Sequence, residues 1–76
     1  MVSAVDIERV THYATVGFVG EIGGFRWSIL ELPAGCSVTV YNGDSKKKIA
    51  TRAKWQNIPQ IVADFINKKQ KEIYHG

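Results

Sequence analysis

Residues 23–43 read GGFRWSILELPAGCSVTVYNG and contain two extended runs bounded by turn signals. The stretch opens on a Gly-Gly pair, which supplies the positive φ angles of a two-residue hairpin turn, and it ends on Asn42-Gly43, the strongest short hairpin signal in the chain. Phe25–Leu32 and Cys36–Tyr41 are the extended runs, and Pro33-Ala34-Gly35 breaks the chain between them. The stretch therefore predicts two antiparallel strands, each continued into a further hairpin.

Extended runs also lie on both sides of this stretch. From His12 to Ile22 the side chains alternate in type, which predicts one strand ahead of the Gly-Gly turn. Lys46–Arg52 follows the Asn-Gly turn and completes a hairpin with the strand before it. We therefore expect a meander of four antiparallel strands.

The last third of the chain carries the signals of an amphipathic helix. Asn57 is a good N-cap, and Pro59 lies in the first turn, where its missing N–H donor does no harm. Gln60 completes a capping-box pattern with Asn57. The large apolar residues that recur at helical spacing along one stripe are Ile58, Ile61, Val62, Phe65, Ile66 and Ile73. This stripe must be buried, and one face of the sheet is the surface available to bury it.

Together these elements predict an α+β fold. It is a small antiparallel four-stranded meander in the order β-β-β-β-α, with one C-terminal amphipathic helix packed across one sheet face. The 76 residues suffice for one small core, so we expect a single compact domain over residues 1–76. The N-terminal segment has two interpretations, because Ser3 with Asp6 would cap a short helical turn or would extend the first strand.

Composition restricts the class of protein. Hydrophobic residues make up 45% of the chain and charged residues 22%, which is typical of a globular protein. Cys36 is the single cysteine, so no disulfide forms within one chain, which favours a reducing compartment. The N-terminus has no basic leader, and no run approaches the ~20 apolar residues of a membrane helix. We expect a cytoplasmic protein that makes no contact with the membrane.

The charges are distributed unevenly along the chain. Positions 45–76 hold eight of the ten lysine and arginine residues but only two of the seven acidic residues. A basic segment of this kind favours a polyanionic partner. Lysines on a terminal strand or at the end of a helix also have purely structural roles, because they prevent edge-to-edge aggregation and complement the helix dipole.

Period-two alternation divides the strand residues between the two faces of the sheet. The side predicted to lie beneath the helix carries Val16, Phe18, Phe25, Trp27, Ile29, Val38 and Val40. The opposite side carries a set without a carboxylate, namely Tyr13, Thr15, Arg26, Ser28, Leu30, Ser37, Thr39, Tyr41, Lys46, Lys48 and Arg52. Tyrosine rings on such a face stack unpaired bases while lysine and arginine neutralise phosphates. An exposed antiparallel face is, however, ordinarily polar even without a ligand.

No set of residues in the sequence specifies a reaction. His12 and His75 lie near opposite ends of the chain, with no cysteine or histidine at the spacing of a metal site. Cys36 has no local base that would activate it as a nucleophile, and a core position is the simpler role for it. We therefore expect a protein that is not an enzyme and has neither a cofactor nor a metal.

Residues 43–53 resemble the Ser-Lys-Lys and alanine-rich helix opening of double-stranded RNA-binding domains. In that family these lysines begin the last helix and grip phosphates across a groove, so the resemblance implies a helix from Ser45. In this chain the spacing from the lysine pair to the alanines differs by one residue, and Pro59 would interrupt such a helix. The order of strands followed by a helix also resembles the arm-binding domains of phage integrases and some single-stranded DNA-binding coactivators.

The leading hypothesis is a small nucleic-acid-binding module, for DNA or RNA, that uses the basic sheet face and the C-terminal lysines Lys68, Lys69 and Lys71. The predicted binding residues are Tyr13, Arg26, Tyr41, Lys46, Lys48, Arg52, Lys54 and Trp55. Trp55 has a second interpretation, as a staple against the helix that follows it. The alternative hypothesis is a protein-interaction module, such as a small phage-like inhibitor or adaptor, that docks on a larger protein or complex. An open sheet edge would also permit a homodimer.

Overall fold

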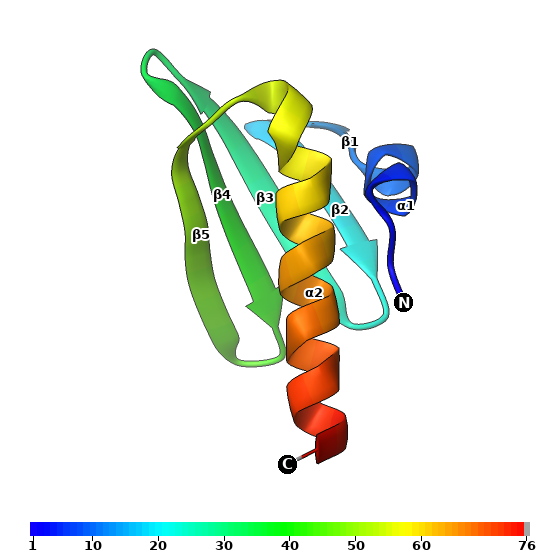
Figure 1. The fold of residues 1–76 in the computed structure, drawn as a ribbon. Helices are drawn as coiled ribbons and strands as arrows, with labels where there is room; N and C mark the ends of the chain where they lie inside the picture. Colours follow the sequence, from blue (N-terminus) through cyan, green and yellow to red (C-terminus); the bar gives the residue numbers. More distant parts are fainter. Residues whose placement is uncertain (76) are drawn as a thin grey trace.

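The computed structural model describes residues 1–75 of the chain and the side chains of residues 1–72. The elements in chain order are α1 (Ala4–Val10), β1 (His12–Ala14), β2 (Gly17–Ile22), β3 (Phe25–Leu32), β4 (Gly35–Asn42), β5 (Ser45–Ala53), the short 3-10 helix η1 (Trp55–Asn57) and α2 (Ile58–His75). The five strands form one antiparallel sheet in the order β1-β2-β3-β4-β5. α1 and α2 lie side by side and pack on one face of this sheet (Figure 1).

The predicted α+β class, the antiparallel meander and the C-terminal helix are confirmed, but the sheet has five strands where four were predicted. The predicted strand over residues 12–22 is a hairpin, in which Ala14 pairs with Gly17 across a turn formed by Thr15 and Val16. Gly17 adopts a φ of 97°, which residues with a side chain rarely adopt. Val16 is therefore 69% exposed in a turn, and its predicted position beneath the helix is wrong.

The core lies between the sheet and the helices and is built around Trp27. This side chain is 1% exposed, and its indole N–H donates a hydrogen bond to the Thr11 hydroxyl at 2.9 Å. Gly20 is the cross-strand partner of Trp27, and a Cβ at Gly20 would lie 2.4 Å from the indole ring, so only glycine fits there. The predicted helix-side residues that are buried are Phe25, Trp27, Ile29, Val38 and Val40.

The N-terminal segment is helical, which decides between the two interpretations of Ser3 and Asp6. The Asp6 amide donates to the Ser3 hydroxyl, and the Ser3 amide donates to the Asp6 carboxylate at 3.0 Å, which completes a capping box. The Ser3 backbone N–H, together with its hydroxyl, holds the pKa of Asp6 below its ordinary value. The segment is tied to the core because Ile7 is buried and Val2 exchanges two hydrogen bonds of 2.8 Å with the Asn67 side chain.

α2 begins at Ile58, directly after the predicted N-cap Asn57, but the predicted capping box does not form. The Asn57 N–H, which a capping box would direct to Gln60, donates instead to the Lys54 carbonyl at 2.9 Å as part of η1. Within the predicted apolar stripe, the buried residues are Ile58, Val62 and Ile66, and the half-buried residues are Ile61 and Phe65. The side chain of Ile73 lies outside those described.

β5 forms the outer edge of the sheet, and its pairing with β4 is irregular. The ladder is regular from Ser45 to Lys48 and then shifts register twice before Ala53 pairs with Cys36. Each shift adds one residue to β5, as a β-bulge does. The helix from Ser45 that the resemblance to double-stranded RNA-binding domains implies is therefore wrong, because this segment is a strand.

Neither helix, over the residues that the structure describes, has the length and apolar character needed to cross a membrane.

Candidate functional site

The open face of the sheet, opposite the helices, brings Arg26, Tyr41 and Lys46 together. They are consecutive cross-strand neighbours on β3, β4 and β5, and such neighbours point to the same side of an antiparallel sheet. The Arg26 Cζ lies 5.9 Å from the centre of the Tyr41 ring, and the Lys46 Nζ lies 6.0 Å from it. Both distances are within cation–π range, so two positive charges flank the Tyr41 ring.

A second row of side chains runs beside this one on the same face. Lys48 on β5 and Thr39 on β4 are cross-strand neighbours, and the row continues through Ser28, Val19 and His12. A shallow depression of about 470 Å³ lies at the β1–β3 end of the face, where both rows contribute to its lining. The face therefore has a concave end on β1–β3 that reaches Tyr41 of β4, and a cationic end on β5, which carries Lys46 and Lys48.

The open face also carries a carboxylate, and the prediction that it carries none is wrong. Glu21 is the cross-strand partner of Arg26. The open-face set predicted from the sequence leaves out Glu21, whereas β2 pairs with β3 as far as Ile22. Because Glu21 opposes the charge of Arg26, the uncompensated positive charge of the face lies with Lys46 and Lys48.

Tyr13 lies on the helix side of the sheet, so its predicted place on the open face is wrong. It is the cross-strand partner of Phe18, and the two rings meet edge to face with centres 5.3 Å apart. Phe18 in turn packs against Trp55, with ring centres 4.8 Å apart. The physical reason is the turn at Thr15 and Val16, which pairs Tyr13 with Phe18 across the β1–β2 hairpin. Strict alternation along one continuous strand would instead place these two residues on opposite faces of the sheet.

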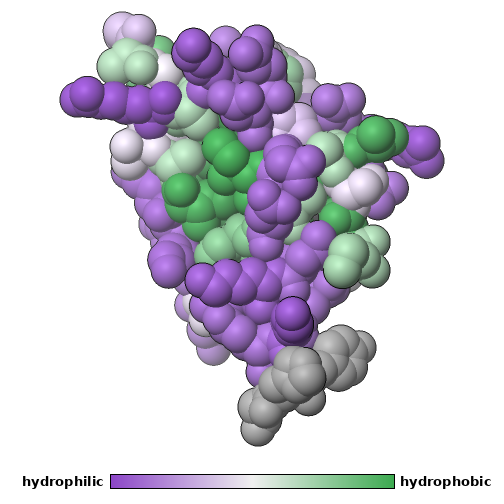
Figure 2. All heavy atoms as spheres, viewed as in Figure 1, coloured by the Kyte–Doolittle hydropathy of each residue, from purple (hydrophilic) through white to green (hydrophobic). Residues whose placement is uncertain are grey.

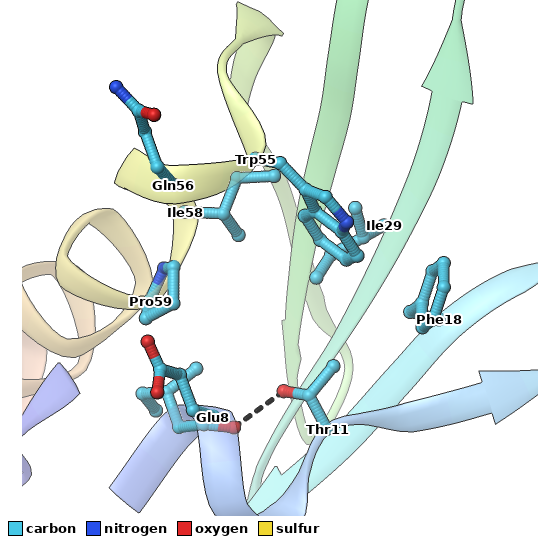
Figure 3. Close-up of a pocket in the computed structure, with 9 residues that line it drawn as sticks. Glu8, Thr11, Phe18, Ile29, Trp55, Gln56, Ile58 and Pro59 are labelled. Carbon is cyan, nitrogen blue, oxygen red and sulfur yellow. Dashed lines mark hydrogen bonds between the residues drawn. The ribbon is translucent and has the colours of Figure 1, made fainter. Parts of the chain in front are cut away.

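These three rings, which we call the aromatic cluster (Tyr13, Phe18 and Trp55), stand next to an apolar groove. The groove measures about 470 Å³ and runs between α1, β2, β3 and the start of α2. Ile29 and Ile58 are among its apolar lining residues, and the Trp55 indole extends toward Phe18 along one side (Figure 3). Tyr13 is 72% exposed and Trp55 41% exposed, so the cluster presents aromatic surface to solvent. The Trp55 ring thus packs against Phe18 on one side and is exposed on the other.

The remaining predicted residues lie apart from the cationic end of the open face. Arg52 lies beyond the two register shifts of β5. Because its neighbour Ala53 pairs with Cys36 on the helix side, Arg52 still faces the open side, but it is four residues along the strand from Lys48. Lys54 links β5 to η1, and both side chains are exposed. The C-terminal lysines are carried by α2, which packs on the other face of the sheet. The structure therefore brings together Arg26, Tyr41, Lys46 and Lys48 and separates Tyr13, Arg52, Lys54 and Trp55 from them.

Sequence reasoning missed four residues of the open face, namely His12, Ala14, Val19 and Glu21. Their assignment depends on the hairpin between β1 and β2, for which Gly17 is the available sequence signal. Cys36 is buried in the core as expected, and burial raises the pKa of its thiol. Among the side chains that the structure describes, no three histidine, cysteine, aspartate or glutamate residues lie together as a metal site would require.

Comparison with protein-family models, with curated proteins and with solved structures finds no significant match. The functional assignment therefore rests on the geometry of the open face and of the groove.

Proposed function

We propose that the chain is a non-enzymatic nucleic-acid-binding module whose open sheet face binds unpaired segments of DNA or RNA. The observation that carries this proposal is the placement of the Tyr41 ring between Arg26 and Lys46 on a solvent-facing sheet. An aromatic ring next to cations combines base stacking with phosphate neutralisation, which is how sheet surfaces bind single strands.

The charges of the face suggest how a strand would lie on it. Lys46 and Lys48 are two residues apart on β5, so their side chains leave the same face about 7 Å apart along the strand. Glu21, on the far side of Arg26, repels phosphate. A bound strand would therefore run its phosphates along β5 and direct a base inward onto Tyr41.

The decisive experiment is a titration of labelled single-stranded DNA, duplex DNA and structured RNA at low and at physiological salt. Lys46→Glu combined with Lys48→Glu is expected to abolish binding, since it reverses the charge where the phosphates would lie. The matched control is Lys68→Glu combined with Lys71→Glu, which makes the same change of net charge at exposed positions of α2 on the other side of the sheet. An equal loss of affinity in the two double variants would show that binding depends on net charge alone and would refute the proposal that the open face is the binding site.

Substitutions of Tyr41 distinguish the contribution of base stacking from that of electrostatic attraction. Tyr41→Phe keeps the ring and should retain most of the affinity. Tyr41→Ala should weaken binding about 5- to 150-fold, which corresponds to the ~1–3 kcal/mol of one base–aromatic stack. If both substitutions weaken binding equally, the hydroxyl and not the ring makes the contact.

The aromatic cluster supports a second candidate function, that of a small inhibitor or adaptor that docks on a larger protein. Tyrosine and tryptophan are enriched in interaction hot spots, and Trp55 borders an apolar groove. In a pull-down from a nuclease-treated extract, Trp55→Ala should release a stoichiometric partner that Lys46→Glu with Lys48→Glu retains. A partner lost with the lysine pair and kept by Trp55→Ala would place the contact on the open face instead.

A further inference from the structure

β5 offers an unpaired edge along one side of the sheet. It stands last in the strand order, and its other side pairs with β4. Within residues 1–75 no further strand covers this edge, so its outward N–H and C=O groups are available to another chain. The regular part of the ladder is Ser45–Lys48, because the register shifts begin after Lys48.

The two sides of this edge differ in chemistry. On the open-face side, Lys46 and Lys48 project at alternate positions. On the helix side, Figure 2 shows an apolar area between α2 and β5 that hydrophilic surface surrounds. The half-buried apolar residues of these two elements are Ile49, Ala50, Ala53, Ile61 and Phe65.

This area is exposed because α2 crosses the middle of the sheet and leaves the outer strand partly uncovered (Figure 1). Nearby, a hollow of about 380 Å³ remains between α2 and the β4–β5 hairpin, with Lys47 and Lys69 among the residues that line it. Positive charge therefore flanks the β5 edge on both faces of the sheet.

We propose that the β5 edge accepts an extended segment of a partner protein as a sixth strand, and that this segment alternates acidic with apolar residues. Side chains on a strand point alternately to the two faces. A segment paired with Ser45–Lys48 would thus place one set beside Lys46 and Lys48 and the other set on the helix side, beside Ser45 and Lys47. On that side it would lie next to the hollow that the apolar side chains of Phe25, Val40 and Phe65 also line. Carboxylates in the first set would pair with the charges of Lys46 and Lys48, and apolar side chains in the second set would contact the helix side.

A second copy of this chain is a poor occupant of the same edge. β5 reads SKKKIATRA and contains four cations and no acidic residue. Two such edges placed side by side would bring like charges opposite one another, which is destabilising. The cations and the bulges thus oppose self-pairing, whereas an acidic strand turns the same cations into attractive contacts.

The probe for this inference is a capped octapeptide that alternates aspartate with valine, titrated to millimolar concentration into the isotope-labelled protein. Amide chemical shifts of Ser45–Lys48 should change saturably. Three altered peptides should each bind at least about tenfold more weakly: one with lysine in place of aspartate, one with serine in place of valine, and one N-methylated at every residue. These three remove charge complementarity, apolar contact and backbone pairing in turn.

Protein variants test the direction of the charge effect. Lys46→Glu with Lys48→Glu should shift the preference from the aspartate–valine peptide to the lysine–valine peptide, whereas Lys68→Glu with Lys71→Glu should leave it unchanged. Three results would overturn the inference: no saturable shift in β5, undiminished binding of the N-methylated peptide, or β5 shifts that follow protein concentration alone and so report a dimer. Because no nucleic acid is present, these outcomes are independent of the proposed nucleic-acid binding.

Discussion

The Thr11 hydroxyl joins the end of α1 to the centre of the core, and its removal gives a measurable prediction. It accepts the indole N–H of Trp27 at 2.9 Å and donates to the Ile7 carbonyl at 2.6 Å. Thr11→Val replaces the hydroxyl by a methyl group of similar size, so the substitution creates no cavity. It leaves the indole N–H without its acceptor in a side chain that is only 1% exposed.

The expected magnitude follows from these contacts. A buried donor without a partner costs about 1–3 kcal/mol. The Ile7 carbonyl loses less, because it still accepts the Thr11 backbone N–H at 3.0 Å. We therefore expect Thr11→Val to lower the free energy of unfolding by about 2 kcal/mol. For a chain of this length, such a change lowers Tm by about 8–16 °C.

Urea unfolding followed by far-ultraviolet circular dichroism would measure this change. Thr51→Val, the same substitution at an exposed position of β5, is the control and should change the free energy of unfolding by less than about 0.5 kcal/mol. In a Trp27→Phe background, Thr11→Val should cost much less, because the phenyl ring has no N–H to satisfy. An equal cost in both backgrounds would refute the assigned role of the hydrogen bond.

Three further predictions concern stability, pH and reactivity. Gly20→Ala should lower the free energy of unfolding by about 1–3 kcal/mol in the same urea assay, because its Cβ would lie 2.4 Å from the Trp27 ring. The lowered pKa of Asp6 means that its capping-box stabilisation is complete above the ordinary pKa near 3.8 and is lost as pH falls through the lowered value. The protection of α1 amides against exchange, relative to the intrinsic exchange rate at each pH, should therefore fall on acidification, and Asp6→Asn should remove that dependence. Burial raises the pKa of Cys36, so iodoacetamide should label its thiol in urea but not in the folded protein at neutral pH.

The hairpins illustrate what the sequence could and could not predict. The Gly23-Gly24 turn was predicted correctly, and both glycines adopt a positive φ. The second hairpin was also predicted, but its turn residues are Gly43 and Asp44, because Asn42 ends β4 and pairs with Ser45. The turn at Thr15 and Val16 was missed because neither residue is a turn former, and the positive φ of 97° falls on the following Gly17. The turn before Gly35 has the same layout, with a φ of 137°, and was recognised because it contains Pro33. Interpreting Gly17 by the same rule would have predicted five strands.

The open face was predicted correctly where the alternation is unbroken. Arg26, Tyr41, Lys46 and Lys48 lie on regular ladders, and their common side follows from period two. The bulges beyond Lys48 have no local signal, because they depend on packing between strands. A Cβ at Gly35, for example, would lie 2.8 Å from the Arg52 carbonyl carbon, and no sequence pattern records that close approach.

Likewise, the choice between helix and strand for the N-terminal segment depends on distant contacts. Ser3 and Asp6 are compatible with either interpretation, but only the helix delivers Ile7 into the core. The two hydrogen bonds between Val2 and Asn67 then join positions 65 residues apart in the chain.

The two tryptophans occupy opposite environments, which makes the chain its own optical reporter. Trp27 is 1% exposed and hydrogen-bonded in the core, whereas Trp55 is 41% exposed beside the groove. A dissolved quencher such as iodide should therefore extinguish the red-shifted emission of Trp55 and leave the blue-shifted emission of Trp27. A ligand bound in the groove would protect the Trp55 emission from the quencher, and unfolding would expose the Trp27 emission to it. Quenching measurements on one unlabelled sample can therefore distinguish ligand binding from unfolding.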